Sequence, residues 1–200
     1  MWYLTITQGA AMQAAPALRC CGRWIYGALW AVLLALALGP LSLAAPNLDR
    51  VQALAQERWG PDAAALVADW RKMINSAREL DETARLEAVN GFFNRRLRFE
   101  DDISVWKQND YWASPMEFMG VGAGDCEDFA IAKYVSLMLL GVPNDKLRLI
   151  YVRAQVGGSP VAHMVVGYYE DPTEEPVILD NLIGSIQRPR RSRCACRDCS

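Results

Sequence analysis

The sequence predicts an α+β fold for the body of the chain, with helices first and antiparallel strands after them. Apolar residues recur at helical spacing from Val51 to Met138, and from Leu147 onward they alternate with a period of about two residues. Glycine and proline residues interrupt these stretches. Helices followed by consecutive strands are typical of α+β domains. The sequence contains no internal repeat, and nothing in it indicates a second domain.

Three helices are expected in the first part of the body. The first begins after Asn47 and ends at Gly60, the second covers residues 62–79, and the third begins after Asp81 and ends near Leu97. Each helix gathers its apolar side chains on one side, which we interpret as a core face.

The stretch 103–119 is rich in aromatic residues and is predicted to be a loop. Its length is typical of a functional segment, so we expect it to wall a cleft beside the next helix. Core packing alone would explain its tryptophans, Trp106 and Trp112, equally well. The acidic run 100–102 before it is interpreted as a solvated turn, with donation of a ligand to a cation as the alternative.

The segment 120–134 carries the strongest chemical signal. Its glycines lead to Asp125, which can cap a helix, and Cys126 then falls in the first helical turn. Unpaired backbone N–H groups and the positive end of the helix dipole lower the pKa of a thiol placed there. Cys126 is therefore a candidate nucleophile. The alternative is a buried cysteine that merely starts a core helix.

Strands are expected after this helix, at residues 147–153, 161–169 and 176–181. The last two form a hairpin if the chain turns at Asp171-Pro172. In that register the sole histidine of the chain, His163, lies directly opposite Asp180.

Cys126, His163 and Asp180 together make a complete set of groups for acyl transfer. Asp180 can accept a ring N–H and fix the tautomer of His163, whose other nitrogen then faces the thiol. The cysteine would act as nucleophile and the histidine as base and acid. A structural histidine paired with an acid is the alternative for His163.

The two ends of the chain differ from the body, residues 46–187. Residues 1–45 combine basic residues, a long uncharged apolar run and small residues, which is the pattern of an export signal. An uncleaved membrane anchor is the alternative, and either reading places the body outside the cytoplasm. Residues 188–200 are basic and contain three cysteines in a spacing that matches no zinc pattern. We expect a disordered tail there, or one altered by truncation or frameshift, instead of a metal site.

The charge of the body argues against a nucleic-acid role. Residues 45–187 contain 14 Lys and Arg against 22 Asp and Glu, a net charge of −8. An acidic surface repels nucleic acid and is compatible with divalent cations. The body contains one cysteine, Cys126, which cannot form a disulfide within it and is therefore a candidate reactive thiol.

Four motifs carry a resemblance to a known family. They are Asp110-Tyr-Trp-Ala-Ser-Pro-Met-Glu-Phe118, Gly122-Ala-Gly-Asp-Cys-Glu-Asp-Phe-Ala-Ile-Ala-Lys-Tyr134, Ala162-His-Met-Val165 and Val177-Ile-Leu-Asp-Asn-Leu182. Over about residues 48–187 the chain resembles the bacterial transglutaminase-like cysteine proteinases, which include periplasmic, adhesin-cleaving proteases of the LapG type. The basic tail departs from that family, which continues at this point with an ordered segment.

The resemblance implies a transglutaminase-like, papain-related fold, in which N-terminal helices and a central nucleophile helix pack on an antiparallel sheet. It implies a triad of Cys126, His163 and Asp180. It also implies a periplasmic enzyme that cleaves a large biofilm adhesin at an N-terminal site with a pair of alanines. The expected inhibitor is the periplasmic domain of a membrane-bound cyclic di-GMP receptor. Membrane contact is expected only through the export segment.

Acidic residues flank the candidate nucleophile. Negative charges at Asp125, Glu127 and Asp128 oppose ionisation of the thiol, and a hard cation such as Ca²⁺ would neutralise them. The resemblance implies calcium at Asp125 and Glu127, and Asp128 is added from its position beside them. The alternative is that Asp125 only caps the helix while the other two acids favour its first turn.

The sequence is therefore compatible with three functions. The first is a calcium-dependent cysteine endopeptidase. The second keeps the triad but transfers the acyl group to an amine, as a transglutaminase does. The third is a non-enzymatic, calcium-dependent binding module whose aromatic segment holds a partner.

Overall fold

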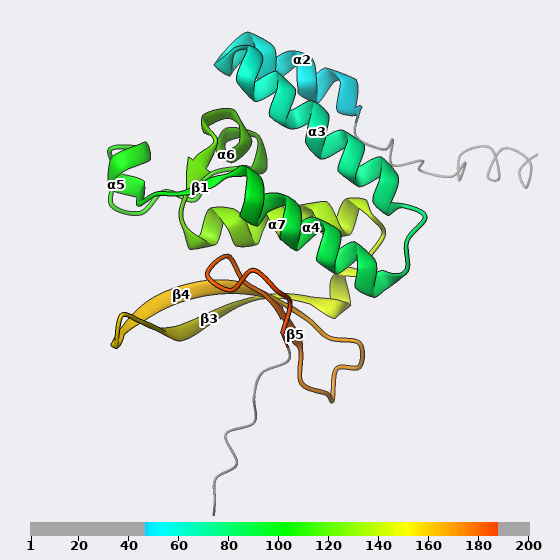
Figure 1. Ribbon diagram of the computed structural model, residues 1–200, viewed down its shortest axis with the longest axis vertical. Helices are drawn as coiled ribbons and strands as arrows, with labels where there is room; N and C mark the ends of the chain where they lie inside the picture. The colour runs from blue at the N-terminus through cyan, green and yellow to red at the C-terminus, as the bar shows by residue number, and fades with distance from the viewer. Residues whose placement is uncertain (1–46, 188–200) are drawn as a thin grey trace, which may run out of the picture. The chain divides into compact units, whose positions relative to one another are not determined.

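The computed structural model describes residues 47–187, in which helices pack on one face of a small antiparallel sheet (Figure 1). The predicted export signal, residues 1–45, and the predicted tail, residues 188–200, lie outside the described residues and stay predictions. Within residues 47–187, none of the helices combines the length and the apolar character that a membrane span requires.

The first part of the described chain forms the helices α2 (Leu48–Trp59), α3 (Pro61–Ala77) and α4 (Glu82–Arg96). As predicted, Asn47 and Asp81 accept hydrogen bonds from backbone N–H groups in the first turns of α2 and α4. Gly60 ends α2 with a positive φ of 89°, a conformation that glycine adopts without strain. The sequence prediction of these three helices is confirmed.

The predicted loop 103–119 is wrong in part, because it contains two short helices. These are α5 (Asp102–Val105) and α6 (Pro115–Val121). Helix α6 begins with a capping box, in which Ser114 and Glu117 each accept a hydrogen bond from the other's backbone N–H. Pro115 at the first helical position favours the same start.

A short parallel pairing joins the segments on either side of α5 and α6. Strand β1 (Arg98–Phe99) pairs with β2 (Ala123–Gly124), and the Glu100 N–H donates to the Gly124 carbonyl at 2.9 Å. This pairing brings the residues after β1 next to the start of helix α7 (Cys126–Leu139). The close approach requires glycine at position 124, because a Cβ there would lie 2.2 Å from the Asp128 carboxylate.

The main sheet has the order β3-β4-β5, and both pairings are antiparallel. Its strands are β3 (Leu147–Val156), which follows the short 3-10 helix η1 (Asn144–Lys146), β4 (Ser159–Tyr168) and β5 (Val177–Leu179). Helix α7 packs on β4 and also against α4 (Figure 1). The α+β prediction, with a central helix on an antiparallel sheet, is confirmed.

The predicted register of the last hairpin is wrong by two residues. Strands β4 and β5 pair Val166 with Leu179, so Asp180 lies diagonal to His163 and not directly opposite it. A shift of two residues keeps both side chains on the same face of the sheet, and diagonal neighbours remain within reach of long side chains.

The cause of the shift is the position of proline in the turn. The hairpin turns at residues 171–174, where the Glu174 N–H donates to the Asp171 carbonyl at 3.0 Å. Pro172 therefore takes the second position of the turn, which its fixed φ favours, whereas the predicted turn would have placed it third.

Phe118 of α6 lies at the centre of the hydrophobic core. It is fully buried, and its ring centroid lies 6.3 Å from that of Phe93 in α4 and 4.8 Å from that of Phe129 in α7. Because three helices meet at this side chain, we expect Phe118→Ala to lower the free energy of unfolding by about 3–5 kcal/mol, measured by urea denaturation.

Val121→Ala on the same helix is the matched control. Val121 is 39% exposed, so its truncation should cost less than about 1 kcal/mol. Equal losses of stability in the two variants would show that the core is not centred on Phe118.

Candidate active site

Cys126 is the first residue of α7 and is partly exposed. Its S–H donates to Oε2 of Glu127 at 3.1 Å. The backbone N–H of Met164, in the buried part of β4, donates to the sulfur. Because Met164 directly follows His163, this contact places the thiol beside the strand that carries the histidine.

His163 is buried in β4 and bonds to the carboxylate of Asp180. The distance from His163 Nε2 to Asp180 Oδ1 is 2.7 Å. A carboxylate in this position accepts the Nε2–H and leaves Nδ1 as the nitrogen that can exchange a proton with another group. The structure therefore brings together the histidine and the acid that the sequence paired, although in a different register.

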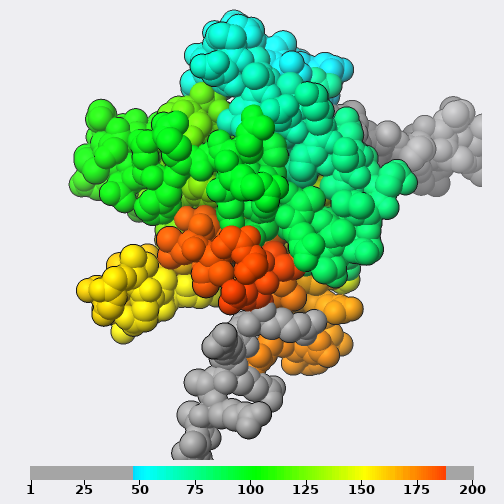
Figure 2. Space-filling view, viewed as in Figure 1, coloured from blue at the N-terminus to red at the C-terminus, as the bar shows by residue number. Residues whose placement is uncertain are grey.

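Asp180 is held in place from several sides. Its Oδ1 also accepts a hydrogen bond from the backbone N–H of Leu182 at 2.9 Å, and its backbone carbonyl accepts one from Nδ2 of Asn94 at 2.7 Å. A second asparagine of α4, Asn90, donates to the Gly184 carbonyl at 3.1 Å. Figure 2 shows the segment that follows β5, in orange-red, lying against the green helices. These bonds from α4 fix the acid after the short strand has ended.

The pKa of the Asp180 carboxyl group lies below its usual range. Burial opposes ionisation of this group, but the hydrogen bonds from His163 and from the Leu182 N–H outweigh burial. The charges of His163 and Lys133 act in the same direction as these bonds. Asp180 is therefore ionised at neutral pH and can stabilise a positive charge on the imidazole.

The predicted lowering of the thiol pKa is wrong for this structure. Burial raises the pKa of Cys126 to about 12, and the hydrogen bond to Glu127 and the charges of Glu127 and Asp125 act in the same direction. The Met164 N–H opposes this rise. The helix N-terminus predicted a lower pKa, whereas the flanking acids predicted a higher one, and the direction of the acids is confirmed for Glu127 and Asp125. Burial, the largest cause, cannot be read from the sequence.

The predicted side-chain cap by Asp125 is also wrong. Asp125 occupies the residue before α7, but its side chain accepts no hydrogen bond from the helix. Its Oδ1 is buried without a hydrogen-bond partner. Burial raises the pKa of Asp125 to about 8, and the adjacent carboxylate of Glu127 adds to the rise. Ionising this carboxyl group is costly unless a cation lies beside it.

Asp125 belongs to a cluster of carboxylates at the start of α7. Within residues 47–187, three groups of side chains each have possible ligand atoms that lie within 4.8 Å of one another. The groups are Asp102, Asp125 and Asp128; Asp102, Asp110 and Glu127; and Asp125, Cys126 and Glu127. Burial raises the pKa of Asp128 to about 6. Like Asp125, both Asp102 and Asp128 have a buried oxygen without a hydrogen-bond partner. Clustered carboxylate oxygens with unused lone pairs fit a hard cation such as Ca²⁺.

The sequence predicts this cluster only in part. Its pattern indicates Asp125, Glu127 and Asp128 as ligands, indicates Asp102 only through the alternative interpretation of the acidic run 100–102, and gives no signal for Asp110. The β1–β2 pairing brings Asp102 to the start of α7, and strands of two residues leave no periodic pattern in a sequence.

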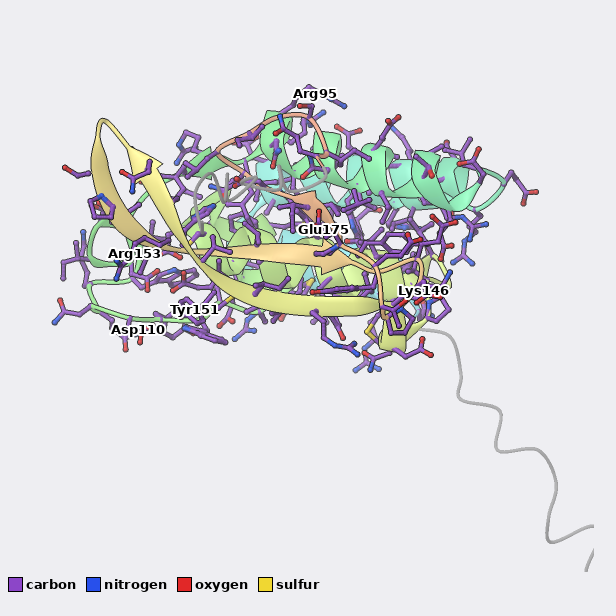
Figure 3. All side chains as sticks on the ribbon, turned by 90° about the horizontal axis from the view of Figure 1, so that it is seen from below. Arg95, Asp110, Lys146, Tyr151, Arg153 and Glu175 are labelled. Atoms are coloured by element: carbon purple, nitrogen blue, oxygen red, sulfur yellow. The ribbon has the colours of Figure 1, made fainter. Side chains whose placement is uncertain are left out.

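The surroundings of the site combine exposed aromatic side chains with an apolar pocket. Tyr151 is 63% exposed, and the charges of Cys126 and of the nearby acids act on it. Figure 3 shows Tyr151 and Asp110 at the same end of the molecule. A pocket of about 520 Å³ is lined by His163, Asp180, the second half of β3 and the apolar Leu182 and Ile183.

The two tryptophans of the stretch 103–119 differ in their surroundings. The indole N–H of Trp112 donates to Oδ1 of Asp110 at 3.0 Å, so it is already engaged. The ring of Trp106 packs against Tyr111, with centroids 4.7 Å apart, and its N–H is buried without an acceptor.

Comparison with known proteins agrees with this geometry. The profile of the family described as bacterial transglutaminase-like cysteine proteinase BTLCP matches residues 65–193. Three solved structures of LapG from Legionella pneumophila, one of them calcium-bound and one EGTA-treated, are each 39% identical to the chain with a TM-score of 0.62. They cover 72% of this chain, which in turn covers between 75% and 77% of theirs. A comparison with curated proteins gave no match. The chain has their transglutaminase-like fold and belongs to the bacterial transglutaminase-like cysteine proteinases.

Proposed function

We propose that this cysteine peptidase is a calcium-dependent endopeptidase of the periplasm that cleaves the N-terminal region of a large surface adhesin and releases it from the cell. The observation that carries the chemistry is the 2.7 Å bond between His163 and Asp180, beside a thiol at the start of α7. These are the parts that a cysteine-nucleophile mechanism requires.

The proposed reaction proceeds through a thioester. The Cys126 sulfur attacks the scissile carbonyl carbon, a C–S bond forms, and His163 takes the thiol proton and delivers it to the leaving amine. Water then attacks the thioester, gives a proton to His163, and releases the acid product and the thiol. Asp180 holds the imidazole and stabilises its charged form. The N–H of Cys126 at the helix start is suited to bind the oxyanion.

Calcium fits this mechanism through the chemistry of the carboxylate cluster. Asp125, Glu127 and Asp128 would hold the ion, together with Asp102 and Asp110. Bound Ca²⁺ would supply positive charge next to a thiol whose ionisation the carboxylates now oppose. The calcium-bound structure of the Legionella relative supports this assignment.

The pocket beside His163 supports a peptide substrate with small apolar side chains. It adjoins the imidazole and Asp180, the pair that in this mechanism protonates the leaving amine. Its apolar lining suits residues such as the paired alanines of the proposed adhesin site.

The proposed partners follow from the family and from the exposed site surface. A peptide strand of the adhesin would enter past Tyr151 and Trp112, which are 63% and 50% exposed. The periplasmic domain of a membrane-bound cyclic di-GMP receptor would inhibit the enzyme by covering the same entrance. Aromatic side chains of this kind are common anchors in protein interfaces.

The test is cleavage of N-terminal adhesin fragments by the purified chain, with Ca²⁺ or with excess EGTA. We expect new chain ends by mass spectrometry with Ca²⁺, and a rate lower by about 100-fold in EGTA or in Asp125→Ala and Glu127→Ala. Glu87→Gln, an exposed acid on α4, is the control and should remain fully active.

Each failure has a distinct meaning in this assay. Full activity in EGTA would remove calcium from the proposal and leave the triad untouched. Crosslinked products without new chain ends would identify a transglutaminase, and binding that survives without any turnover would identify a binding module.

A further inference from the structure

Strand β4 has a free edge beside the active site. Strand β5 pairs only with the last residues of β4, from Val166 to Tyr168, and ends at Leu179. Among the described residues, no strand pairs with the earlier part of β4, residues 159–165, on this edge. Figure 1 shows the β3–β4 hairpin running on beyond the short β5. The edge therefore has room for an additional strand.

The hydrogen bonds of the sheet show which backbone groups this edge presents. Ile178 of β5 exchanges two backbone hydrogen bonds with Gln187, on the side away from β4. Its neighbours in β5 must therefore bond to β4, where one of them pairs with Val166. Backbone groups alternate between the two edges of an antiparallel strand, so Met164 and Ala162 point to the same edge as Val166.

The catalytic thiol occupies the first of these two positions, and the second is open. The N–H of Met164 donates to the sulfur of Cys126, which agrees with this alternation. Ala162 is exposed, and its N–H and carbonyl point away from β3. Pro160, the next residue that points this way, has no N–H, so the edge can donate no further. An extended peptide that pairs with Ala162 lies two residues, about 7 Å, along the strand from the thiol.

The side chains of a peptide on this edge would alternate between two different surroundings. The residues next to the one opposite Ala162 share the face of His163, which lines the pocket of about 520 Å³. The residue opposite Ala162 shares the face of Ala162 and of its partner in β3, Arg153. Because the alanine side chain is short, the long side chain of Arg153 can reach over it to the added strand.

Arg153 is an exposed cation close to an acidic site. Its guanidinium forms no hydrogen bond or ion pair with the described residues, 47–187. Figure 3 shows Arg153 and Tyr151 toward the end of the molecule that carries Asp110. A carboxylate on a bound peptide would be repelled by the carboxylate cluster but attracted by Arg153.

We infer that the free edge of β4 at Ala162 binds the backbone of the substrate as an added strand, and that Arg153 selects a carboxylate on the substrate residue opposite Ala162. The occupant is the peptide to be cleaved, because this edge continues directly from the thiol that attacks it. The inference rests on the peptidase chemistry proposed above, but it does not require the adhesin as substrate.

The first test locates the bound residue on the substrate. The chain is profiled with Ca²⁺ on a synthetic library of twelve-residue peptides, and the best substrate is resynthesised with one N-methylated residue at a time. The carbonyl of Ala162 accepts a peptide N–H from one residue of an added strand. Apart from the scissile amide, we therefore expect methylation at one position to lower kcat/KM about tenfold, and methylation at its neighbours to have much smaller effects.

The second test removes the donor of this edge. Ala162→Pro deletes an N–H that points away from β3, so the β3–β4 pairing keeps its hydrogen bonds. We expect KM for the library peptide to rise about tenfold, and methylation at the sensitive position to cost less than about twofold in this variant. Alkylation of Cys126 by iodoacetamide, measured by peptide mapping, is the control, because a reagent without a peptide backbone should react at the wild-type rate.

The third test concerns the side chain at the position found by methylation. The wild type should cleave peptides with Asp or Glu there about fivefold faster, in kcat/KM, than peptides with Lys. Arg153→Gln should abolish this preference, and Arg153→Glu should reverse it. Arg148→Gln is the matched control, because Arg148 is exposed on the opposite face of β3 and its loss should keep the wild-type preference.

The outcomes separate the two parts of the inference. Equal losses along the methylated series, or a full methylation effect that persists in Ala162→Pro, would overturn substrate binding at this edge. A wild type without an acidic preference, or a preference unchanged in Arg153→Glu, would overturn the role of Arg153. If Ala162→Pro does not fold, the methylated series on the wild type decides alone. Absence of cleavage of both the library and the adhesin fragments would refute the proposed function and this inference with it.

Discussion

Replacing Cys126 with alanine is expected to lower kcat/KM for adhesin cleavage by at least about 10⁴-fold, because no other group at the site can form the covalent intermediate. The side chain is small and partly exposed, so the fold should be retained. Binding of the substrate should persist, since the pocket beside His163 does not include Cys126. The measurements are product formation by mass spectrometry, the melting temperature, and substrate affinity by calorimetry.

The tail of the same chain provides the matched control for thiol chemistry. Cys194→Ala, Cys196→Ala and Cys199→Ala, combined in one variant, should cleave at the wild-type rate. Cleavage by Cys126→Ala near the wild-type level would exclude Cys126 as the nucleophile. Loss of activity in the tail variant would show that a cysteine of the tail takes part in the reaction.

Removing the acid of the pair is expected to have the next largest effect. Asp180→Ala removes both the hydrogen bond and the charge, and should lower kcat/KM by about 10³–10⁴-fold. In Asp180→Asn the side-chain oxygen can still accept the ring N–H and the Leu182 N–H, so only the charge is lost. We expect a decrease of about 10–100-fold for this variant, and the ratio of the two losses measures how much orientation contributes beyond charge.

Asp171→Asn in the turn of the same hairpin is the control for these variants. Asp171 is exposed in the turn and accepts hydrogen bonds from Thr173, not from either member of the buried pair. It should cleave at close to the wild-type rate. If Asp180→Ala lost no more activity than Asp171→Asn, the 2.7 Å bond to His163 would be structural only.

The helices and the identity of the triad candidates were predictable because they leave strong local patterns. Asn47 and Asp81 precede apolar stripes at helical spacing, and His163 and Asp180 fall on one face of adjacent strands in either register. The exact register was not predictable from symmetry alone, because the preference of Pro172 for the second turn position moves the pairing by two residues. Helix α6 was missed although its signal, Ser-Pro-Met-Glu at 114–117, stands in the sequence.

The environment of the nucleophile could not be predicted in the same way. The pKa of Cys126 depends on its burial and on its distance from Glu127, which only the packing of α7 on β4 decides. Asp102 joins the carboxylate cluster through a two-residue strand pairing with no sequence pattern, and Asp110 lies in the cluster beside it. Lys133 stands in the chain like any other helix residue, and only the structure shows that its side chain is completely buried.

The central claim is that the Cys126 sulfur bonds to the substrate during cleavage. Excess enzyme is mixed with an adhesin fragment, quenched in acid within the first turnover, and analysed by intact mass and peptide mapping. The account predicts a transient adduct equal in mass to the N-terminal product less water, joined as a thioester to the peptide that contains Cys126. Product formation with no adduct at any time point, together with activity that survives in Cys126→Ala, would contradict it.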